Sequence, residues 1–566
     1  MTDDCEREVF ARVLDALLRE DHLGLLSTGR LDGPGLSTGG LDGPDLSTGR
    51  PDGPDWWQVP RPGGLLRIPV RADGFQQTLR NTAPMVLVVA NGATHRTDTL
   101  EGLLTVLAPH GNAEAEAGWR DFGTECRADL RARRLAARDR PRVLAEVATA
   151  RASTPTGLPA ALLDDVLAAH HGHPVYPTDR CRHGLSDDEL LRYAPEHAPR
   201  FALRWYAAPA EGVRLTGELP AWWPRAQRPD QVLLPAHPIT AARHALPVTD
   251  LPVISARPTL SMRTVALDDD PYLHLKLPLP TASLGARNRR TLHPGSLADG
   301  AAVAALLEKI AGAEPAFAGR IRHADESTWA HVDGDERRSF LLRRFPRDLA
   351  GVHVVPVAAL AAADPVAGTV LERLSLERIS PERPGTLLES YLDLLLDWHV
   401  FLWLRHGIAL EAHPQNIHLL VHPDGTVGLL YKDNDGARLD ARHGGPGGLV
   451  LADDRMWARD PQELADVFIT ITLHLAAAAP LIALAARGLP VPTPAEALTP
   501  RLAAARDRWG DGPAARTFTE WVLRAAHLPI KAMLTAGTLL PKQRLGCADI
   551  NKYYLRTGPN YLRETR

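Results

Sequence analysis

Apolar positions repeat with a helical period in two parts of the chain, and each repeat predicts a helix with one buried face. The first lies within residues 1–25, and its apolar face consists of Val9, Phe10, Val13, Leu14, Leu17 and Leu18. The second consists of Leu387, Leu388, Tyr391, Leu394, Leu395, Trp398 and Leu402. We expect the second helix to end near His406, because the glycine that follows it is a common helix stop.

Shorter apolar runs predict strands. Residues 65–70 and 85–89 are the first of them, followed by helices to about residue 170. Further strands are expected at 201–205, 232–234 and 272–279. An uncharged run at 467–486 is long enough to cross a bilayer, but it contains polar residues, so we expect a buried helix that breaks near Pro480.

A hairpin is predicted late in the chain. Ile417–Val421 and Val427–Tyr431 are apolar, and Pro-Asp-Gly stands between them. This hairpin places Asn416 at the foot of one strand and Asp433 at the end of the other. Residues seventeen positions apart therefore become neighbours.

Residues 26–55 hold three copies of a ten-residue repeat, each with Ser-Thr-Gly and Asp-Gly-Pro. Such residues favour turns and cannot build a core, so we interpret the repeat as an insert of low complexity.

Composition excludes several classes of protein. The 566 residues are 45% hydrophobic and 23% charged with a formal net charge of −4, which is ordinary for a globular protein and unlike a nucleic-acid or membrane surface. This length predicts more than one core. The four cysteines form no CxxC pair, and the N-terminus lacks the apolar segment of a signal peptide, so we expect a reducing cytoplasm.

The foot of the hairpin carries the strongest candidate chemistry. Glu411, His413 and Asn416 stand on one turn, and Asp433 and Asp435 follow the second strand. Carboxylates with phosphate oxygens are the ligands that Mg²⁺ prefers, while imidazole and carboxamide groups can hold phosphates by hydrogen bonds. The group predicts an enzyme that binds Mg²⁺ and ATP.

Two upstream clusters complement this group. Ser261, Arg263, Thr264 and Lys276 supply hydroxyls and cations for a triphosphate. Ser283 and the arginines at 287, 289 and 290 form a second candidate for carboxylate or phosphate. No P-loop, GxGxxG or GxSxG motif is present, so any ATP site is of another kind.

His-Pro pairs recur along the chain, and His173 lies in the densest polar setting among them. Its segment, Gly-His-Pro-Val-Tyr-Pro-Thr-Asp-Arg-Cys-Arg-His-Gly, is followed by Tyr-Ala-Pro-Glu at 193–196 and Leu-Pro-Ala-His-Pro at 234–238. Together with the clusters above, in this order and spacing, these segments resemble the IucA/IucC family of NRPS-independent siderophore synthetases over residues 165–550.

The resemblance implies an α+β, multi-region fold shaped like a hand, with a palm of antiparallel hairpin and helices distantly like a kinase. The implied parts are an N-terminal helix at 1–25, the repeat insert at 26–55, a thumb-like region at 56–170, fingers at 171–380 and a palm at 381–566. Homodimers are common in the family.

The implied reaction is the activation of a carboxylate of citrate, or a related polycarboxylic acid, as an acyl-adenylate. An amine, amino acid or amino alcohol then attacks to give an amide or ester. Phosphates would contact Ser261, Arg263, Thr264, Lys276, His413 and Asn416, while Glu411, Asp433 and Asp435 would hold Mg²⁺. The acid would bind His173, Ser283, Lys531 and an arginine of the 287–290 group. Spacing from Lys276 favours Arg287, and the Arg-Thr-Leu ending favours Arg290.

Two other functions fit parts of the pattern. Glu411 stands five residues before Asn416, as the catalytic-loop Asp does before Asn in kinases, so a small-molecule kinase is one alternative. A siderophore-binding protein without catalysis is the other. Neither nucleic acid nor a membrane is an expected partner.

Overall fold

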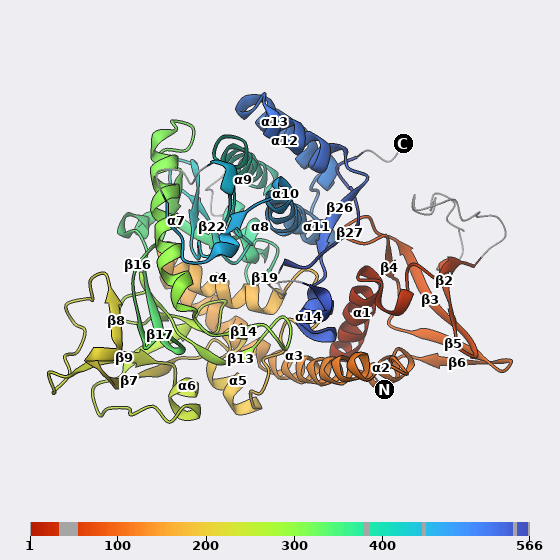
Figure 1. The fold of residues 1–566 in the computed structure, drawn as a ribbon, viewed down its shortest axis with the longest axis horizontal. Coiled ribbons are helices and arrows are strands. Elements are labelled where there is room, and N and C mark those ends of the chain that lie inside the picture. The colour runs from red at the N-terminus through yellow and green to blue at the C-terminus, as the bar shows by residue number, and fades with distance from the viewer. Residues whose placement is uncertain (1, 33–54, 377–383, 444–448, 547–551, 564–566) are drawn as a thin grey trace.

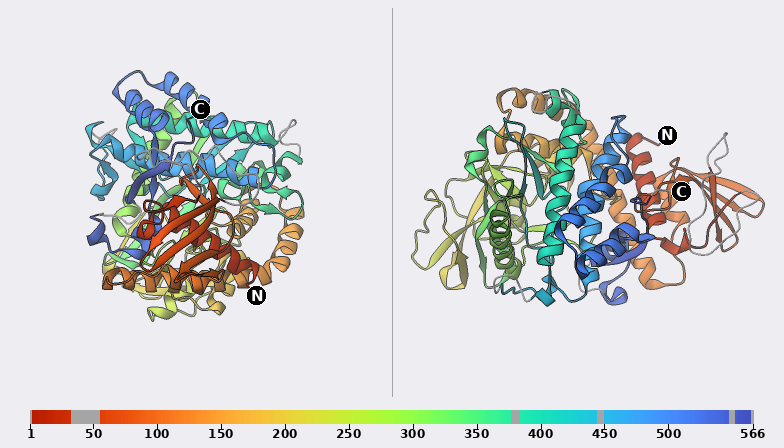
Figure 2. Two further views of the ribbon diagram at one scale, coloured as in Figure 1. Left: turned by 90° about the vertical axis from the view of Figure 1, so that its right-hand side faces the viewer. Right: turned by 90° about the horizontal axis from the view of Figure 1, so that it is seen from above.

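The computed structural model is a mixed helix and strand protein with a sheet at each end and helices between and above them (Figure 1). Seen from above, the N-terminal sheet forms one end of an elongated molecule (Figure 2). The structure describes residues 2–32, 55–376, 384–443, 449–546 and 552–563. Most of the ten-residue repeat, at 33–54, lies outside these described residues.

The predicted N-terminal helix is α1 (Asp4–Arg19), and all six of its predicted apolar residues are buried. Asp3 caps it by accepting a hydrogen bond from the Glu6 amide at 2.8 Å. α1 packs against α3 (Ala113–Ser153), a 41-residue helix that runs along the base of the molecule (Figure 1). The N-terminal sheet has the order β1-β2-β3-β5-β6, with β4 paired to β3. Its strands are β1 (Arg30–Leu31), β2 (Asp55–Arg61), β3 (Gly64–Ala72), β4 (Leu79–Asn81), β5 (Val86–Ala90) and β6 (Ala93–Thr97).

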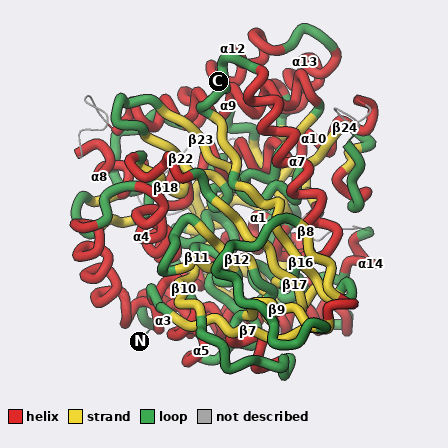
Figure 3. The backbone as a smooth tube through the Cα atoms, turned by 90° about the vertical axis from the view of Figure 1, so that its left-hand side faces the viewer, coloured by secondary structure: helices red, strands yellow, loops and turns green. Residues whose placement is uncertain are grey.

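An eight-stranded sheet forms the opposite end and has the order β8-β16-β17-β12-β11-β10-β7-β9 (Figure 3). Its strands are β7 (Phe201–Pro209), β8 (Val213–Thr216), β9 (Gln231–Ala236), β10 (Ile254–Pro258), β11 (Thr264–Leu267), β12 (Leu273–Lys276), β16 (Asp325–Val332) and β17 (Asp335–Arg344). The strand predicted at 272–279 is wrong as a single element. It divides into β12 and β13 (Leu279–Ala282), because Pro278 has no N–H to continue a ladder. β13 instead pairs with β14 (Arg289–Arg290).

The predicted hairpin is confirmed as β22 (Ile417–Val421) and β23 (Val427–Tyr431), with Ile417 opposite Tyr431. It lies in a four-stranded sheet of order β15-β23-β22-β18, completed by β15 (Ile321–His323) and β18 (His353–Pro356). The second predicted helix is α9 (Pro384–His406), which packs against β23. α7 (Pro294–Ala313) packs between this sheet and β16.

The uncharged run lies in one helix, Pro461–Ala486, which is long and apolar enough to cross a membrane. Within the protein, 89% of its most apolar stretch of 18 residues is buried. It comprises α10 (Pro461–Val467), the π-helix η9 (Phe468–Ala478) and α11 (Ala479–Ala486). The predicted break at Pro480 is wrong. Proline removes the N–H that would bond the Ala476 carbonyl, but the Tyr391 hydroxyl donates to that carbonyl at 2.8 Å.

Candidate functional site

A cavity of about 490 Å³ lies where the eight-stranded sheet, the foot of the hairpin and the C-terminal segment meet. Most of the residues predicted for the site line it. These are His173, Ser261, Arg263, Ser283, Arg290, Glu411, His413, Asp435 and Lys531. The structure therefore brings members of the three sequence clusters to one place together with His173 and Lys531, and these residues span more than 350 positions of the chain.

Asp433 forms a buried ionic cluster at the junction of two sheets. It follows β23 with φ 59, a left-handed conformation that Asp tolerates. Lys276, the last residue of β12, places its Nζ 2.6 Å from Asp433 Oδ1 and 3.6 Å from Asp435 Oδ2. Arg343 of β17 contacts the same Asp433 oxygen at 2.7 Å and Glu326 at 2.5 Å. We call these five residues the Asp433 cluster.

The charge state of Asp433 follows from these contacts. Burial alone would raise its pKa, but Arg343 and Lys276 together hold the pKa of this carboxyl far below its usual range. The residue is therefore an anion at pH 7. Its charge joins β12 and β17 of one sheet to the hairpin of the other.

Glu411 forms a second ionic cluster across the cavity. Lys531, at the end of β26 (His527–Lys531), lies 3.1 Å from Oε1, and Lys552 lies 3.2 Å from Oε2. Against the effect of burial, Lys552 and Lys531 hold the pKa of Glu411 well below its usual range. A Cβ at Gly436 would approach Glu411 Oε2 to 2.2 Å, so only glycine leaves room for this carboxylate. We call Glu411, Lys531 and Lys552 the Glu411 cluster.

Two predicted arginines crowd one wall of the cavity. Arg263 donates to the Thr291 carbonyl at 2.7 Å, and Arg290 donates from Nε to the Ser283 hydroxyl at 2.5 Å. Burial, together with the neighbouring Arg263 and Arg182, lowers the pKa of Arg290 to about 9. Cations that repel one another in a buried wall are suited to an anionic ligand.

The structure separates the two candidate arginines. Arg290 lines the cavity, whereas Arg287 is not one of the described residues that line it. The Arg287 amide instead donates to the Gly537 carbonyl at 3.0 Å.

Four other predicted residues, Lys276, Thr264, Asn416 and Asp433, are not among the described residues that line the cavity. Thr264 is buried in β11 opposite Lys276, and Asn416 accepts through its carbonyl from the Lys432 amide at 3.1 Å. Asp433 reaches the cavity only through its cluster. His413 does line the cavity, and burial lowers its pKa to about 4, so its imidazole is neutral at pH 7.

Three residues of the two clusters escaped the sequence analysis: Glu326, Arg343 and Lys552. Arg343 follows the apolar run Phe-Leu-Leu in β17 and is only 1% exposed. A charged residue inside a buried strand is the signal that would have found it. Nothing in the local sequence marks Lys552, which reaches Glu411 because β26 pairs with β27 (Tyr554–Pro559).

The predicted metal ligands do not form one group. Within the described part of the chain, no set of three or more His, Cys, Asp or Glu residues is arranged to hold a metal ion. Both oxygens of Glu411 contact lysines, which argues against a metal there. Asp433 and Asp435 do lie together on Lys276 and fit the one or two carboxylates that Mg²⁺ takes beside phosphate oxygens.

Comparisons with known proteins identify related sequences and a shared fold. Residues 167–362 match the IucA / IucC family, and residues 386–546 match the family described as ferric iron reductase FhuF-like transporter. Staphyloferrin A synthase of Staphylococcus aureus is 26% identical over 48% of this chain and 52% of its own length. The rhizobactin siderophore biosynthesis protein RhbC of Rhizobium meliloti is 27% identical over 47% of this chain and 52% of its own.

The chain thus spans about half the length of these curated relatives. Among solved structures, ATP-bound aerobactin synthetase IucA from a hypervirulent pathotype of Klebsiella pneumoniae superposes with a TM-score of 0.71 at 18% identity. The superposition covers 98% of this chain and 99% of that one, so the two share a fold.

Proposed function

We propose that this chain, related to the IucA / IucC family through residues 167–362, is an ATP-dependent siderophore synthetase. It would adenylate a carboxylate of citrate or a related polycarboxylic acid and condense it with an amine or hydroxyl. One observation carries the proposal: Arg263, Arg290 and Lys531 line the same cavity as Asp435 and His413. Cations for two anionic substrates and a carboxylate for Mg²⁺ therefore share one site.

The chemistry has two balanced steps. A carboxylate oxygen attacks the α-phosphorus of ATP, which forms the acyl-adenylate and releases pyrophosphate. An amine then attacks the acyl carbon, and the amide forms as AMP and a proton leave. Carboxylates acylate poorly because oxide is a poor leaving group, and adenylation supplies a better one.

This chain's residues would serve the first step by stabilising negative charge. Arg263 and Arg290 donate from a buried wall, where fixed cations act more strongly than in water. Lys276 would join them from the Asp433 cluster. Asp433 and Asp435 would hold Mg²⁺, which when bound neutralises charge on the phosphates. Neutral His413 can donate or accept one hydrogen bond at the phosphates or the acid.

We also propose the finer architecture and setting. The N-terminal sheet with α3 would be the thumb, the eight-stranded sheet the fingers, and the four-stranded sheet with α9 a distantly kinase-like palm. The domain ranges expected from the sequence would apply except that β15 and β18, which lie within 171–380, would belong to the palm. The enzyme would work as a homodimer in the cytoplasm.

The test is a screen of carboxylic acids against a panel of amines for acid-dependent release of pyrophosphate. We expect AMP and pyrophosphate from wild type and none from Arg263→Ala. Arg257→Ala is the matched control, because Arg257 pairs with Asp268 and does not line this cavity. ADP as the product would instead show a kinase. Wild-type turnover by Arg263→Ala would overturn the site assignment.

A second function is favoured by the match of residues 386–546 to the FhuF-like family. A protein that binds a ferric siderophore without consuming ATP would use the same cations for an anionic iron complex. It predicts tight binding of ferric siderophores and no pyrophosphate release with any acid.

A further inference from the structure

The loop between α4 (Gly157–His171) and α5 (Asp187–Tyr193) carries His173 to the cavity. Its shape begins at Gly172, which has φ 82 and lies so close to Asp179 that a Cβ would meet Oδ2 at 2.3 Å. Asp179 in turn accepts a hydrogen bond from the His173 amide. The loop is thus folded around one buried carboxylate.

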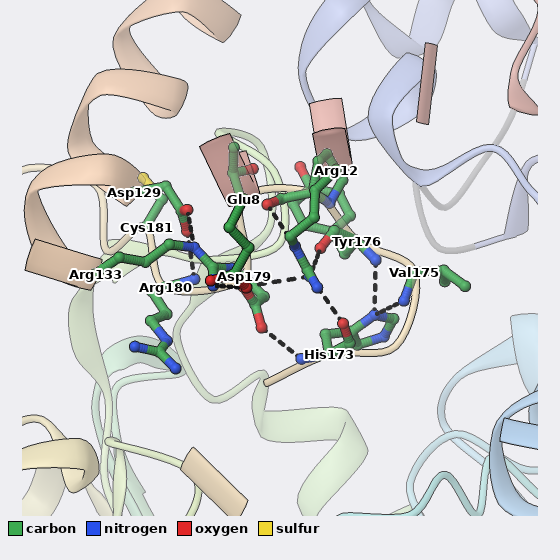
Figure 4. Close-up of polar contacts among 12 residues, drawn as sticks. Glu8, Arg12, Asp129, Arg133, His173, Val175, Tyr176, Asp179, Arg180 and Cys181 are labelled. Carbon is green, nitrogen blue, oxygen red and sulfur yellow. Dashed lines mark hydrogen bonds and ion pairs between the residues drawn. The ribbon is translucent and has the colours of Figure 1, made fainter. Parts of the chain in front are cut away.

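Two arginines from the N-terminal region hold that carboxylate and the loop (Figure 4). Arg133 of α3, 3% exposed, contacts Asp179 and also bonds Asp129 at 2.6 Å. Arg12 of α1 donates to the His173 carbonyl at 2.8 Å and to the Pro177 carbonyl at 3.2 Å. Both arginines lie outside the segments that match the two families.

Asp129 adds a further tie from α3. Its second oxygen accepts a hydrogen bond from the Arg180 amide at 2.7 Å. Backbone groups at 173, 177 and 180 therefore all bond to side chains of α1 or α3. The N-terminal helices fix the loop along its length.

This arrangement also fixes the imidazole of His173. The amides of Val175 and Tyr176 both donate to Nδ1, at 3.2 and 2.9 Å (Figure 4). Nδ1 is therefore the acceptor nitrogen, and the proton of the neutral ring is on Nε2. Burial lowers the pKa of His173 to about 3, so the ring is neutral near pH 7. No described residue hydrogen-bonds Nε2, which lies on the opposite side of the ring.

We propose that Arg12 and Arg133 are positioning residues that hold His173 so that its Nε2–H donates a hydrogen bond to an anionic oxygen of a substrate in the cavity. The inference rests on the proposed function for the nature of that oxygen, which belongs either to the acid's carboxylate or to an ATP phosphate. His173 then acts as a neutral donor and not as a general base.

Two replacements of His173 separate its two nitrogens. Asn can place an oxygen where Nδ1 accepts but lacks a donor at the Nε2 position, whereas Gln places an amide donor near Nε2. Calorimetric titration with citrate and, separately, with ATP should show about a tenfold higher Kd for His173→Asn. His173→Gln should stay within about twofold of wild type. The ligand whose Kd changes identifies the oxygen.

The arginines are tested in the same titrations. Arg12→Met should weaken the same ligand, Arg12→Lys should restore part of the loss, and Arg12→Met with His173→Asn should be no weaker than His173→Asn alone. Arg134→Met is the matched control, since Arg134 ties α3 to Asp3 and Glu6 of the N-terminal segment without touching the loop. Melting temperatures identify any variant whose loss is global.

Equal losses for His173→Asn and His173→Gln, or no loss for His173→Asn, would overturn the donor role. Additive losses in the double variant, or equal effects of Arg12→Met and Arg134→Met, would overturn the positioning role. A wild type that binds citrate or ATP but releases no pyrophosphate contradicts the proposed function and leaves this inference standing. A wild type that binds neither ligand overturns the inference as well.

Discussion

The two ionic clusters share one arrangement, a carboxylate held by two cations, and differ in position. In each, a half-buried carboxylate contacts two cations, and these cations hold the pKa of the carboxyl far below its usual range. The cations on Asp433 come from strands β12 and β17 of the eight-stranded sheet, whereas those on Glu411 come from β26 and from the segment just before β27. Similar contacts therefore predict unequal roles: the Asp433 cluster joins two sheets beside the proposed phosphate site, and the Glu411 cluster orients two lysines.

The largest effect is expected from the Asp433 cluster. Asp433→Asn should lower acid-dependent pyrophosphate release by roughly 10² to 10³-fold, because it leaves Lys276 and Arg343 without their shared carboxylate and removes an Mg²⁺ ligand. Asp424→Asn, on the exposed turn of the same hairpin, is the control. Turnover of Asp433→Asn near that of the control would show that the cluster is structural only.

A smaller and different effect is expected from the Glu411 cluster. Glu411→Gln keeps the shape of the side chain but frees two lysines, so the KM for the acid should rise about tenfold. The Mg²⁺ concentration that gives half the maximal rate should not change, whereas Asp435→Asn should raise it. A higher Mg²⁺ requirement in Glu411→Gln would instead identify Glu411 as a metal ligand, and the two clusters would then have the same role.

A third effect, on stability and not on turnover, is expected at acid pH. Neither cluster carboxylate titrates between pH 4 and 6.5, but His237, enclosed by Tyr193 and Phe201, has its pKa lowered by burial to about 3. The unfolded chain therefore binds the extra proton first, and the stability that this residue contributes is lost as pH falls below about 6.5. The loss is about 2 kcal/mol between pH 7 and pH 5.

His237→Asn keeps an acceptor for the Ile239 amide, which bonds Nδ1 at 3.2 Å, and removes this titration. Urea unfolding at pH 7 and pH 5 should show a smaller pH dependence for the variant. If the free energy of unfolding fell equally with pH in wild type and in His237→Asn, the effect assigned to the burial of His237 would be contradicted.

Local patterns were enough to predict the elements that position the site. The hairpin, α1 and α9 have strong periodicity and clear stop signals, so their existence and much of their extent follow from sequence. The single strand predicted at 272–279 is wrong because the apolar run continues through Pro278, whereas proline has no N–H to continue the hydrogen-bond ladder. The helix break predicted at Pro480 is absent for the opposite reason. The Tyr391 hydroxyl, from a helix distant in sequence, donates to the Ala476 carbonyl that the proline leaves without its usual donor.

The partners of the site residues were less accessible to sequence analysis. Arg343 and Lys552 reach their carboxylates through strand pairing between distant segments, which no spacing rule encodes. The same holds for Arg12, which lies 161 positions before the His173 carbonyl that it contacts. Residue types predicted many of the polar side chains that line the cavity, and tertiary packing decided which charged groups pair with one another.

Glu20, the residue that follows α1, accepts hydrogen bonds from the amides of Leu534 and Thr535 at 3.0 and 2.8 Å. These partners are more than 500 positions apart, so their contact forms late in folding and at a high cost in loop-closure entropy. During synthesis the first helix is exposed long before the segment next to Lys531 leaves the ribosome. We therefore expect the Lys531 side of the cavity to assemble after the eight-stranded sheet has formed.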